Sequence, residues 1–304
     1  MTDLPQFGIF VPQLGMEADA VIDAARGAEE AGFDSFWVMD HLFAPGAPTL
    51  DALESWTLLA AIAASTSDIR LGHLVVCNPL RHPAVLAKMA ATVDRISGGR
   101  LDLGLGWGSI EAEFEMFGID HGSRKQRAQQ LGETVEILRL MFSGEPFDFD
   151  GKHFQLSGAY GRPTPAQETI PIHIGGAGKQ LTMPLVAEYA DWWNCVGGAR
   201  DQLDDLRPLS GGARLSVQYA VGVVTEESLR AKVIERTARR LPESGWGAAL
   251  VGTPAELVGM FEAEIDRGVE LCIVRLHDLA DPETIKIFGR EVIAPIQERR
   301  SPER

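Results

Sequence analysis

An aspartate and a histidine stand side by side at a point where proton transfer would be possible. Asp40 and His41 directly follow the β-rich run Ser35–Met39. Histidine gains and loses a proton near neutral pH, and a carboxylate beside it can orient it. We therefore take His41 as a candidate proton or hydrogen-bond donor and Asp40 as a residue that orients the site. A satisfied structural histidine is the alternative.

A glycine-rich turn, Gly175-Gly176-Ala177-Gly178-Lys179, offers a second kind of chemistry. It is not a P-loop, because that motif needs glycine at position 173 and Ser or Thr at 180, where the chain has His173 and Gln180. Free backbone N–H groups at a strand-to-helix turn still bind phosphate, and Lys179 would add a positive charge. We predict a phosphate site at this turn; a tight turn without ligand is the alternative.

A third candidate is the glycine cluster Gly104-Leu105-Gly106-Trp107-Gly108-Ser109, which lacks the last glycine of the dinucleotide fingerprint. In a strand over 101–105, the leucines share one face, and Gly104 and Gly106 lie on the other. If the leucines pack on helices, the glycines leave room for a flat ring. Trp107 is a candidate wall residue of that site, as are Trp37, Trp56 and Phe43, for which ordinary core packing is the alternative.

These candidates all follow predicted strands, and strands alternate with helical periodicity along the whole chain. The predicted strands are Phe7–Val11, Ser35–Met39, Arg70–Val76, Leu101–Leu105, Ile170–Ile174, Trp192–Val196, Leu215–Val224 and Leu271–Leu276. The predicted helices are Ala18–Ala31, Trp56–Ser65, Pro83–Ile96, Gln126–Phe142, Lys179–Tyr189, Gln202–Leu206, Glu226–Leu241, Thr253–Arg267 and Thr284–Glu298.

Eight such units indicate a parallel α/β protein with right-handed crossovers, and they favour a (β/α)8 TIM barrel with insertions over an open sheet. We expect residues 1–304 to form a single domain. In such barrels the catalytic residues lie at the C-terminal ends of the strands, where the candidates above are placed. The irregular segment Ser143–Thr169 precedes the fifth strand, so we expect it to serve packing.

Composition narrows the possible partners. The 304 residues carry 28 basic and 43 acidic side chains, a net charge of −15, which disfavours nucleic acid and anionic membranes. No apolar run reaches the ~18 residues of a membrane span, and no secretory signal is visible. Cys77, Cys195 and Cys272 have no CxxC spacing, so we expect reduced, buried thiols in a cytoplasmic protein.

The chain resembles the luciferase-like monooxygenase superfamily over essentially its whole length. Four blocks in this order carry the resemblance: Ala31–His41, Asn78–Pro83, Asp94–Leu101 and Ile172–Gly176. Within the superfamily, the phosphate turn and the segment Ala190–Asn194 are most similar to the branch that uses the deazaflavin coenzyme F-420. Many members have a glycine where this chain has Trp192, which puts in doubt how closely a cofactor approaches that strand.

The resemblance implies a barrel that binds reduced flavin or deazaflavin at the strand C-termini. It implies a non-proline cis peptide at Val75-Val76 that backs the ring, and it matches Asp40 and His41 to the pair that contacts the ring. The expected cofactor-binding residues are Val75, Val76, Asn78, Gly106, Trp107, Gly175, Gly176, Ala177, Gly178, Lys179 and Asn194.

The predicted function is an oxidoreductase that transfers hydride between coenzyme F-420 and a small organic substrate; an FMN-dependent monooxygenase is the alternative. From other classes, a metal-dependent barrel hydrolase or isomerase using His41, His173 and His277-Asp278 stays open, as does a non-catalytic flavin-binding protein. We expect a homodimer. The substrate pocket is expected among the loops Leu42–Ser55 and Trp107–Gly122, with Gly197–Ala213 as a candidate mobile lid.

Overall fold

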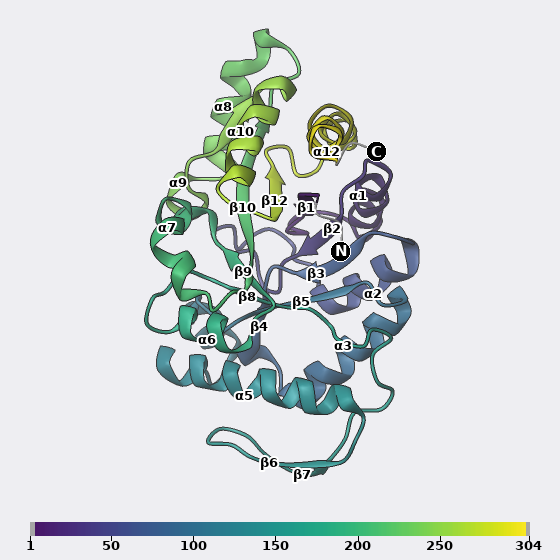
Figure 1. The fold of residues 1–304 in the computed structure, drawn as a ribbon, viewed down its shortest axis with the longest axis vertical. Helices are drawn as coiled ribbons and strands as arrows, with labels where there is room; N and C mark the ends of the chain where they lie inside the picture. Colours follow the sequence, from purple (N-terminus) through teal and green to yellow (C-terminus); the bar gives the residue numbers. More distant parts are fainter. Residues whose placement is uncertain (1–3, 302–304) are drawn as a thin grey trace.

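The computed structural model describes residues 4–301, and its parallel strands close into a barrel (Figure 1). Each strand pairs with the next along the chain, and β12 returns to pair with β1. The predicted (β/α)8 barrel is thereby confirmed. Its strands are β1 (Gln6–Phe10), β2 (Ser35–Val38), β3 (Arg70–His73) with β4 (Val76–Cys77), β5 (Leu101–Gly106), β8 (Ile172–Gly175), β9 (Trp192–Cys195), β10 (Arg214–Val223) and β12 (Leu271–Leu276).

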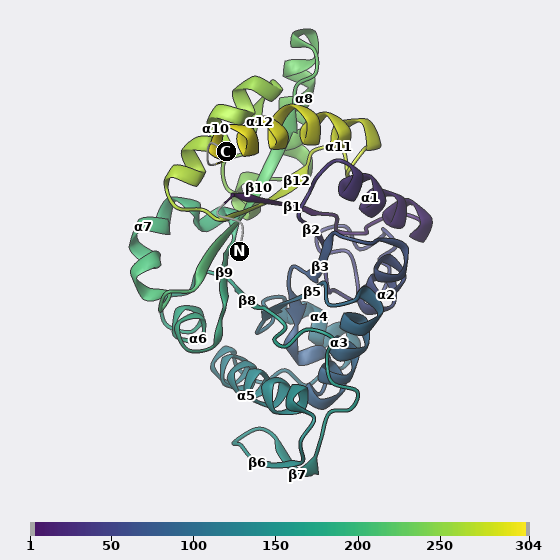
Figure 2. The same cartoon turned by 45° about the vertical axis from the view of Figure 1, so that its right-hand side comes forward.

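Helices surround the barrel (Figures 1 and 2), and the first of them, α1, packs beside α11, near the end of the chain. Capping boxes start two of them: Ser123 caps α5 and Thr253 caps α10, the latter as predicted. The helices are α1 (Ala18–Glu30), α2 (Ser55–Ser65), α3 (Pro83–Ser97), α4 (Glu111–Phe117), α5 (Arg124–Ser143), α6 (Thr182–Tyr189), α7 (Leu203–Leu206), α8 (Arg230–Arg240), α9 (Glu243–Trp246), α10 (Pro254–Asp266), α11 (Pro282–Phe288) and α12 (Ala294–Arg300).

Three of the differences between the structure and the sequence prediction concern strands. The third predicted strand is divided into β3 and β4, with a cis peptide between them at Leu74-Val75, one bond before the expected Val75-Val76. The segment expected to be irregular forms an antiparallel hairpin, β6 (Phe147–Asp150) and β7 (Gln155–Ala159), which lies outside α5 (Figure 1). A short strand, β11 (Leu250–Gly252), pairs with β10.

The candidate lid is also more structured than expected. It forms two 3₁₀ turns, η2 (Gly197–Gln202) and η3 (Arg207–Leu209), on either side of α7. Leu203 and Leu206 of α7 are buried in the main hydrophobic core. Because two leucines anchor it, this segment packs as part of the barrel wall rather than as a free lid.

The core has two parts, one beneath the helices and one inside the barrel. Leu101, Leu103 and Leu105 pack outward in the large cluster beneath the helices, as their strand face predicts. Trp37 lies in a second cluster inside the barrel, together with Trp192, Leu271 and Ile273, so it is core rather than cavity wall. These side chains fill the interior below the strand C-termini, and the space above them remains for a site.

Candidate active site at the mouth of the barrel

A cavity of about 600 Å³ opens at the C-terminal ends of the strands, where barrel enzymes carry their sites. Of the predicted residues, it brings together His41, Val75, Val76, Gly106, Trp107, Gly175, Gly176, Ala177 and Gly178. It does not include Asp40, Asn78, Lys179 or Asn194 among its lining residues. The walls also include apolar side chains that the sequence analysis did not select: Leu74, Ile110, Val196 and Trp246.

The floor of this cavity is the side chain of Val75, which is surrounded by three glycines. A Cβ atom on Gly106 would lie 2.6 Å from Val75 Cγ2, and one on Gly175 would lie 3.0 Å from Val75 Cγ1. At Gly104 a Cβ would overlap the carbonyl oxygen of His73. That Gly104 and Gly106 make room for a ring stays a prediction, and the structure shows a second reason for glycine at these positions. They make room for the displaced β3–β4 segment, and Val75 presents the surface on which a ring would rest.

This arrangement predicts the effect of the smallest possible change at Gly106. In Gly106→Ala the added methyl group has to displace Val75, so we expect binding of a ring-shaped cofactor to weaken about tenfold, at the ~1.4 kcal/mol scale of overpacking. Gly27→Ala is the matched control, because a Cβ there meets nothing within 4 Å. Cofactor titration of both variants measures the difference. Equal affinities would show that the position of Val75 is unimportant for binding.

The glycine turn after β8 lies at the rim of the cavity. Gly176, at φ +125°, has a backbone conformation that favours glycine, and its N–H donates to the Asn194 carbonyl at 3.0 Å. Among residues 4–301, no protein acceptor is found for the backbone N–H groups of Ala177 and Gly178, which line the cavity. Two exposed amide donors in a short turn suit an anion.

Lys179 contributes to this turn less directly than expected. Its ammonium group is more than half exposed and lies 3.7 Å from the Asp205 carboxylate, outside the cavity. The helix after the turn begins at Thr182 rather than at Lys179, because Lys179 to Leu181 form a turn. The predicted helix N-terminus at Lys179 is therefore wrong, and a contact between Lys179 and a phosphate stays a prediction.

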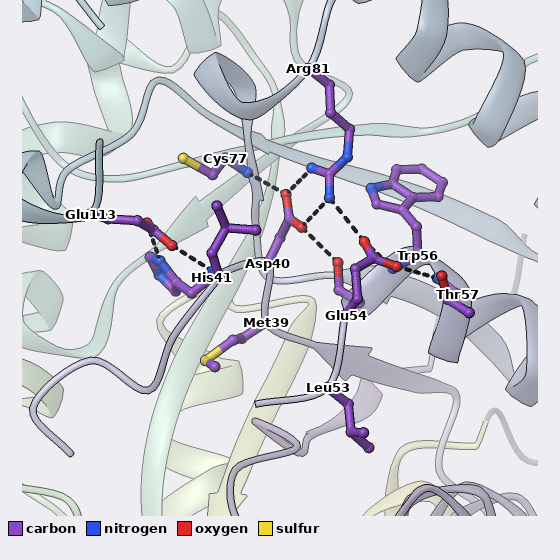
Figure 3. Close-up of polar contacts among 12 residues, drawn as sticks. Met39, Asp40, His41, Leu53, Glu54, Trp56, Thr57, Cys77, Arg81 and Glu113 are labelled. Carbon is purple, nitrogen blue, oxygen red and sulfur yellow. Dashed lines mark hydrogen bonds and ion pairs between the residues drawn. The ribbon is translucent and has the colours of Figure 1, made fainter. Parts of the chain in front are cut away.

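His41 stands on the cavity wall with one ring nitrogen fixed. Its Nδ1 lies 2.8 Å from Glu113 Oε2, and the backbone N–H of Leu42 donates to Glu113 Oε1 at 2.6 Å (Figure 3). The side chain of Glu113 is 1% exposed and that of His41 is 24% exposed. When the Nδ1–H group donates its hydrogen bond to this carboxylate, Nε2 of the neutral ring is left free to act as a base. The pair can therefore take up and return a proton.

Asp40 has a different role from the one expected. Its carboxylate accepts two hydrogen bonds from the Arg81 guanidinium, at 2.6 and 2.9 Å, one from the Ser55 hydroxyl and one from the Cys77 N–H (Figure 3). Burial alone raises the pKa of Asp40, but the bonds and charge of Arg81 outweigh burial and hold the pKa below its usual range. Glu113, and not Asp40, is the carboxylate that bonds His41. Asp40 instead ties the end of β2 to β4, the strand that directly follows Val75.

Two other predicted residues lie behind the cavity. Asn194 is buried, and its amide joins Ser216 to Gln218, whose side chain does line the cavity. Asn78 is buried in a 3₁₀ turn after β4 and does not reach the cavity. Trp56 is also buried, against His73 at a ring distance of 4.3 Å. These residues support the wall rather than form it.

The three histidines of the metal-enzyme alternative lie in three different parts of the barrel. His41 lines the main cavity, His173 is buried in the barrel between Trp37 and Trp192, and His277 lines a separate pocket on the side of β10. Within the described part of the chain, no three His, Cys, Asp or Glu residues are grouped so that they could hold a metal ion. The arrangement gives no support to a metal-dependent hydrolase.

The sequence reasoning missed Glu113, Gln218 and Trp246. Glu113 is one of several acidic residues in a segment that the sequence analysis treated as a loop and that forms α4 in the structure. Only the fold shows which of these residues contacts His41. Gln218 has an available signal, since it is a polar residue inside an apolar strand. Trp246 ends α9 and does not follow a predicted strand, and nothing in the local sequence marks it as a cavity residue.

A family model described as "luciferase-like monooxygenase" matches residues 5–223. An uncharacterized protein of Mycobacterium tuberculosis is 33% identical over 186 residues, 56% of this chain and 65% of that protein. An F-420-dependent hydroxymycolic acid dehydrogenase of the same species is 32% identical over 219 residues, 71% of this chain and 56% of that enzyme. The chain thus spans less than two thirds of the length of either relative.

Solved structures share the fold at low identity. An F-420-dependent secondary alcohol dehydrogenase with an F-420–acetone adduct has a TM-score of 0.81 at 19% identity, covering 96% of this chain and 99% of that one. The oxygenating constituent of a Baeyer–Villiger monooxygenase from Pseudomonas putida, in complex with FMN, has a TM-score of 0.76 at 19% identity, covering 96% and 98%. No helix among residues 4–301 is long and apolar enough to cross a membrane.

Proposed function

The chain belongs to the luciferase-like monooxygenase family, and on that premise we propose that it is an oxidoreductase that transfers hydride between coenzyme F-420 and a small organic substrate. The observation that carries the proposal is His41, whose imidazole is held by Glu113 at the cavity wall with Nε2 left for a substrate. The name of the F-420-dependent dehydrogenase relative supports the choice of cofactor.

The cavity residues suit a flat ring with an anionic tail. Val75 provides an apolar surface at the floor, and Gly106 and Gly175 keep the approach to it open. Ala177 and Gly178 supply backbone donors at the rim for a phosphate, where their N–H groups have no protein acceptor among the described residues. When bound, the deazaflavin would supply the site that accepts or gives the hydride. Lys179 is left out of this binding set.

The protein side of the reaction is proton transfer at His41. As an alcohol is oxidised, its O–H proton would pass to Nε2 of His41, and the Glu113 carboxylate would stabilise the imidazolium that results. In the reverse direction the same imidazolium would protonate the developing alkoxide. Apolar walls that include Leu74, Ile110 and Trp107 limit access of water to this step.

Glu113 is a positioning residue in this scheme, and its replacement tests the pair. In Glu113→Gln we expect kcat to fall about 10- to 10²-fold and KM to stay the same. This loss corresponds to the ~1.5–3 kcal/mol that a hydrogen bond to a charged group contributes. Glu113→Asp keeps the carboxylate and is expected to recover part of the loss. Steady-state kinetics of both variants measures the effect, with Glu115→Gln, at an exposed position of the same helix, as the control. Equal losses in the Gln and Asp variants would indicate a merely structural role.

The test of the proposed activity separates hydride transfer from oxygen insertion. Under anaerobic conditions, F-420 mixed with the protein and a panel of small alcohols is expected to lose its visible absorbance as it is reduced. The same protein with reduced FMN and oxygen is expected to release only peroxide and to oxygenate none of the substrates. Oxygen insertion with FMN, together with no reduction of F-420 by any alcohol, would favour the monooxygenase instead.

A further inference from the structure

A second chamber of about 360 Å³ adjoins the main cavity. Five residues line both chambers, so the two spaces lie side by side: His41, Leu74, Ile110, Gln218 and Trp246. The glycine turn and Val75 line only the first chamber, and Met39, Arg240 and Arg275 line only the second. His41 therefore lies at the boundary between the main cavity, which suits the proposed cofactor, and the second chamber, which is available to another ligand.

Arg275, near the end of β12, extends its guanidinium group toward the second chamber. The guanidinium carbon lies 4.7 Å from the centroid of the Trp246 ring and 5.9 Å from that of Phe10. Its Nε is buried and has no hydrogen-bond partner among residues 4–301. In the same described part of the chain, no carboxylate lies within ion-pair distance of Arg275. The aromatic rings hold the group in place, while its hydrogen-bonding capacity is unused.

A second arginine reinforces the positive charge. Arg240, the last residue of α8, donates one hydrogen bond from Nη1 to the His277 carbonyl at 3.1 Å, and it too has no carboxylate partner in the part of the chain that the structure describes. Burial, with the charge of Arg240 added to it, lowers the pKa of Arg275 to about 10. Two positive charges thus line one chamber, and no acidic lining residue reduces the repulsion between them.

The contrast with the rest of the chain is what makes this chamber informative. The protein carries a net charge of −15, and other partly or fully buried arginines have bonded partners: Arg70 pairs with Asp102, Arg81 pairs with Asp40, and Arg100 donates to four backbone carbonyls. No lining residue of the second chamber is acidic. A partly buried guanidinium without a partner is unfavourable, because it has lost hydration and gained no bond in return. A bound anion would offset that loss by accepting a bidentate, charge-assisted hydrogen bond.

We propose that the substrate carries an oxyanion, a carboxylate or a phosphomonoester, and that Arg275 with Arg240 binds it in the second chamber. The anion would hold the substrate so that its hydroxyl-bearing carbon lies at the chamber boundary, beside His41 Nε2 and above the cofactor position. This inference rests on the proposed function for the reaction, but the anion site itself does not. Arg275 is then a residue that determines specificity.

Calorimetric binding of two matched probe pairs tests the anion site without turnover. The pairs are glycerol 3-phosphate against glycerol, and 3-hydroxybutyrate against 2-butanol. We expect at least one anionic probe to bind at least about tenfold more tightly than its neutral partner, and Arg275→Gln to remove that preference. Which pair shows the larger preference tells phosphomonoester from carboxylate. Arg214→Gln is the matched control, since Arg214 also lies over a tryptophan, Trp192, but lines a pocket at the other end of the barrel.

Binding of F-420 to the same variants is measured separately by the fluorescence of the coenzyme. We expect Arg275→Gln to bind F-420 as the unaltered protein does. The proposal is overturned if neither anionic probe binds more tightly than its neutral partner, if Arg214→Gln removes the preference equally, or if Arg275→Gln loses F-420 binding. Failure of the unaltered protein to bind F-420, with the anion preference intact, would instead contradict the proposed function alone.

Discussion

Replacing His41 with alanine is expected to lower kcat by about 10²- to 10⁴-fold, the usual contribution of a general acid or base. The loss follows from geometry, because His41 is the residue shared by both chambers that is also fixed by a buried carboxylate. F-420 affinity is expected to change little, since the proposed cofactor contacts are with Val75 and the glycine turn. Rapid mixing with a substrate found in the alcohol panel measures the hydride-transfer rate, and a titration measures affinity.

The control for His41 is a histidine that serves only the fold. His82 is exposed and caps α3 by accepting a hydrogen bond from the Ala84 N–H. His82→Asn keeps a good cap and is expected to retain full turnover. A His41→Ala protein that bound F-420 and still turned over at the rate of the unaltered protein would assign His41 a structural role.

The second large effect is expected for Asp40→Ala, which should lower the free energy of unfolding by about 3–5 kcal/mol. The substitution leaves the Arg81 guanidinium without its bidentate partner in a site where the Arg81 side chain is only 12% exposed. It also frees the Ser55 hydroxyl and the Cys77 N–H, which both lie next to the cavity floor. Urea unfolding of the variant measures the loss of stability.

The contribution of this ion pair has a defined pH dependence. Because the pKa of Asp40 is lowered in the folded protein, its stabilisation is fully present above the unfolded value of ~3.9 and is lost as pH falls through the folded pKa. The stability advantage over Asp40→Asn should therefore be constant near neutral pH and shrink only in more acidic solution. Asp205→Ala, at an exposed pair with Lys179, is expected to change stability by less than ~1 kcal/mol. Equal effects at Asp40 and Asp205 would contradict the assigned role of Asp40.

The barrel itself follows from local patterns in the sequence. Short β-branched runs such as the one around Val217 alternate with helices whose caps are visible, as at Thr253-Pro254, and eight such units have few other ways to pack. The sequence also predicts that His41 follows a strand directly. In a barrel, a residue at the C-terminal end of a strand lies at the mouth, whichever side chains it contacts there.

The partners of that residue could not be predicted in the same way. Asp40 is the neighbour of His41 in sequence, but successive residues point in different directions, and the buried Arg81 competes for its carboxylate. Glu113 is more than 70 residues away and becomes the partner only when α4 packs over the barrel mouth. Val75 was recognised, but its contact with three glycines depends on the division of β3 from β4.

The most direct test of the central claim is titration of the purified protein with F-420 and with FMN, followed by the fluorescence of each. We expect saturable 1:1 binding of F-420. FMN should bind more weakly by at least about tenfold, or ~1.4 kcal/mol. Affinity for F-420 should fall in Gly106→Ala but not in Gly27→Ala. Tight binding of FMN with none of F-420 would contradict the choice of deazaflavin. Binding of neither would contradict the assignment of this cavity to a flavin-like cofactor.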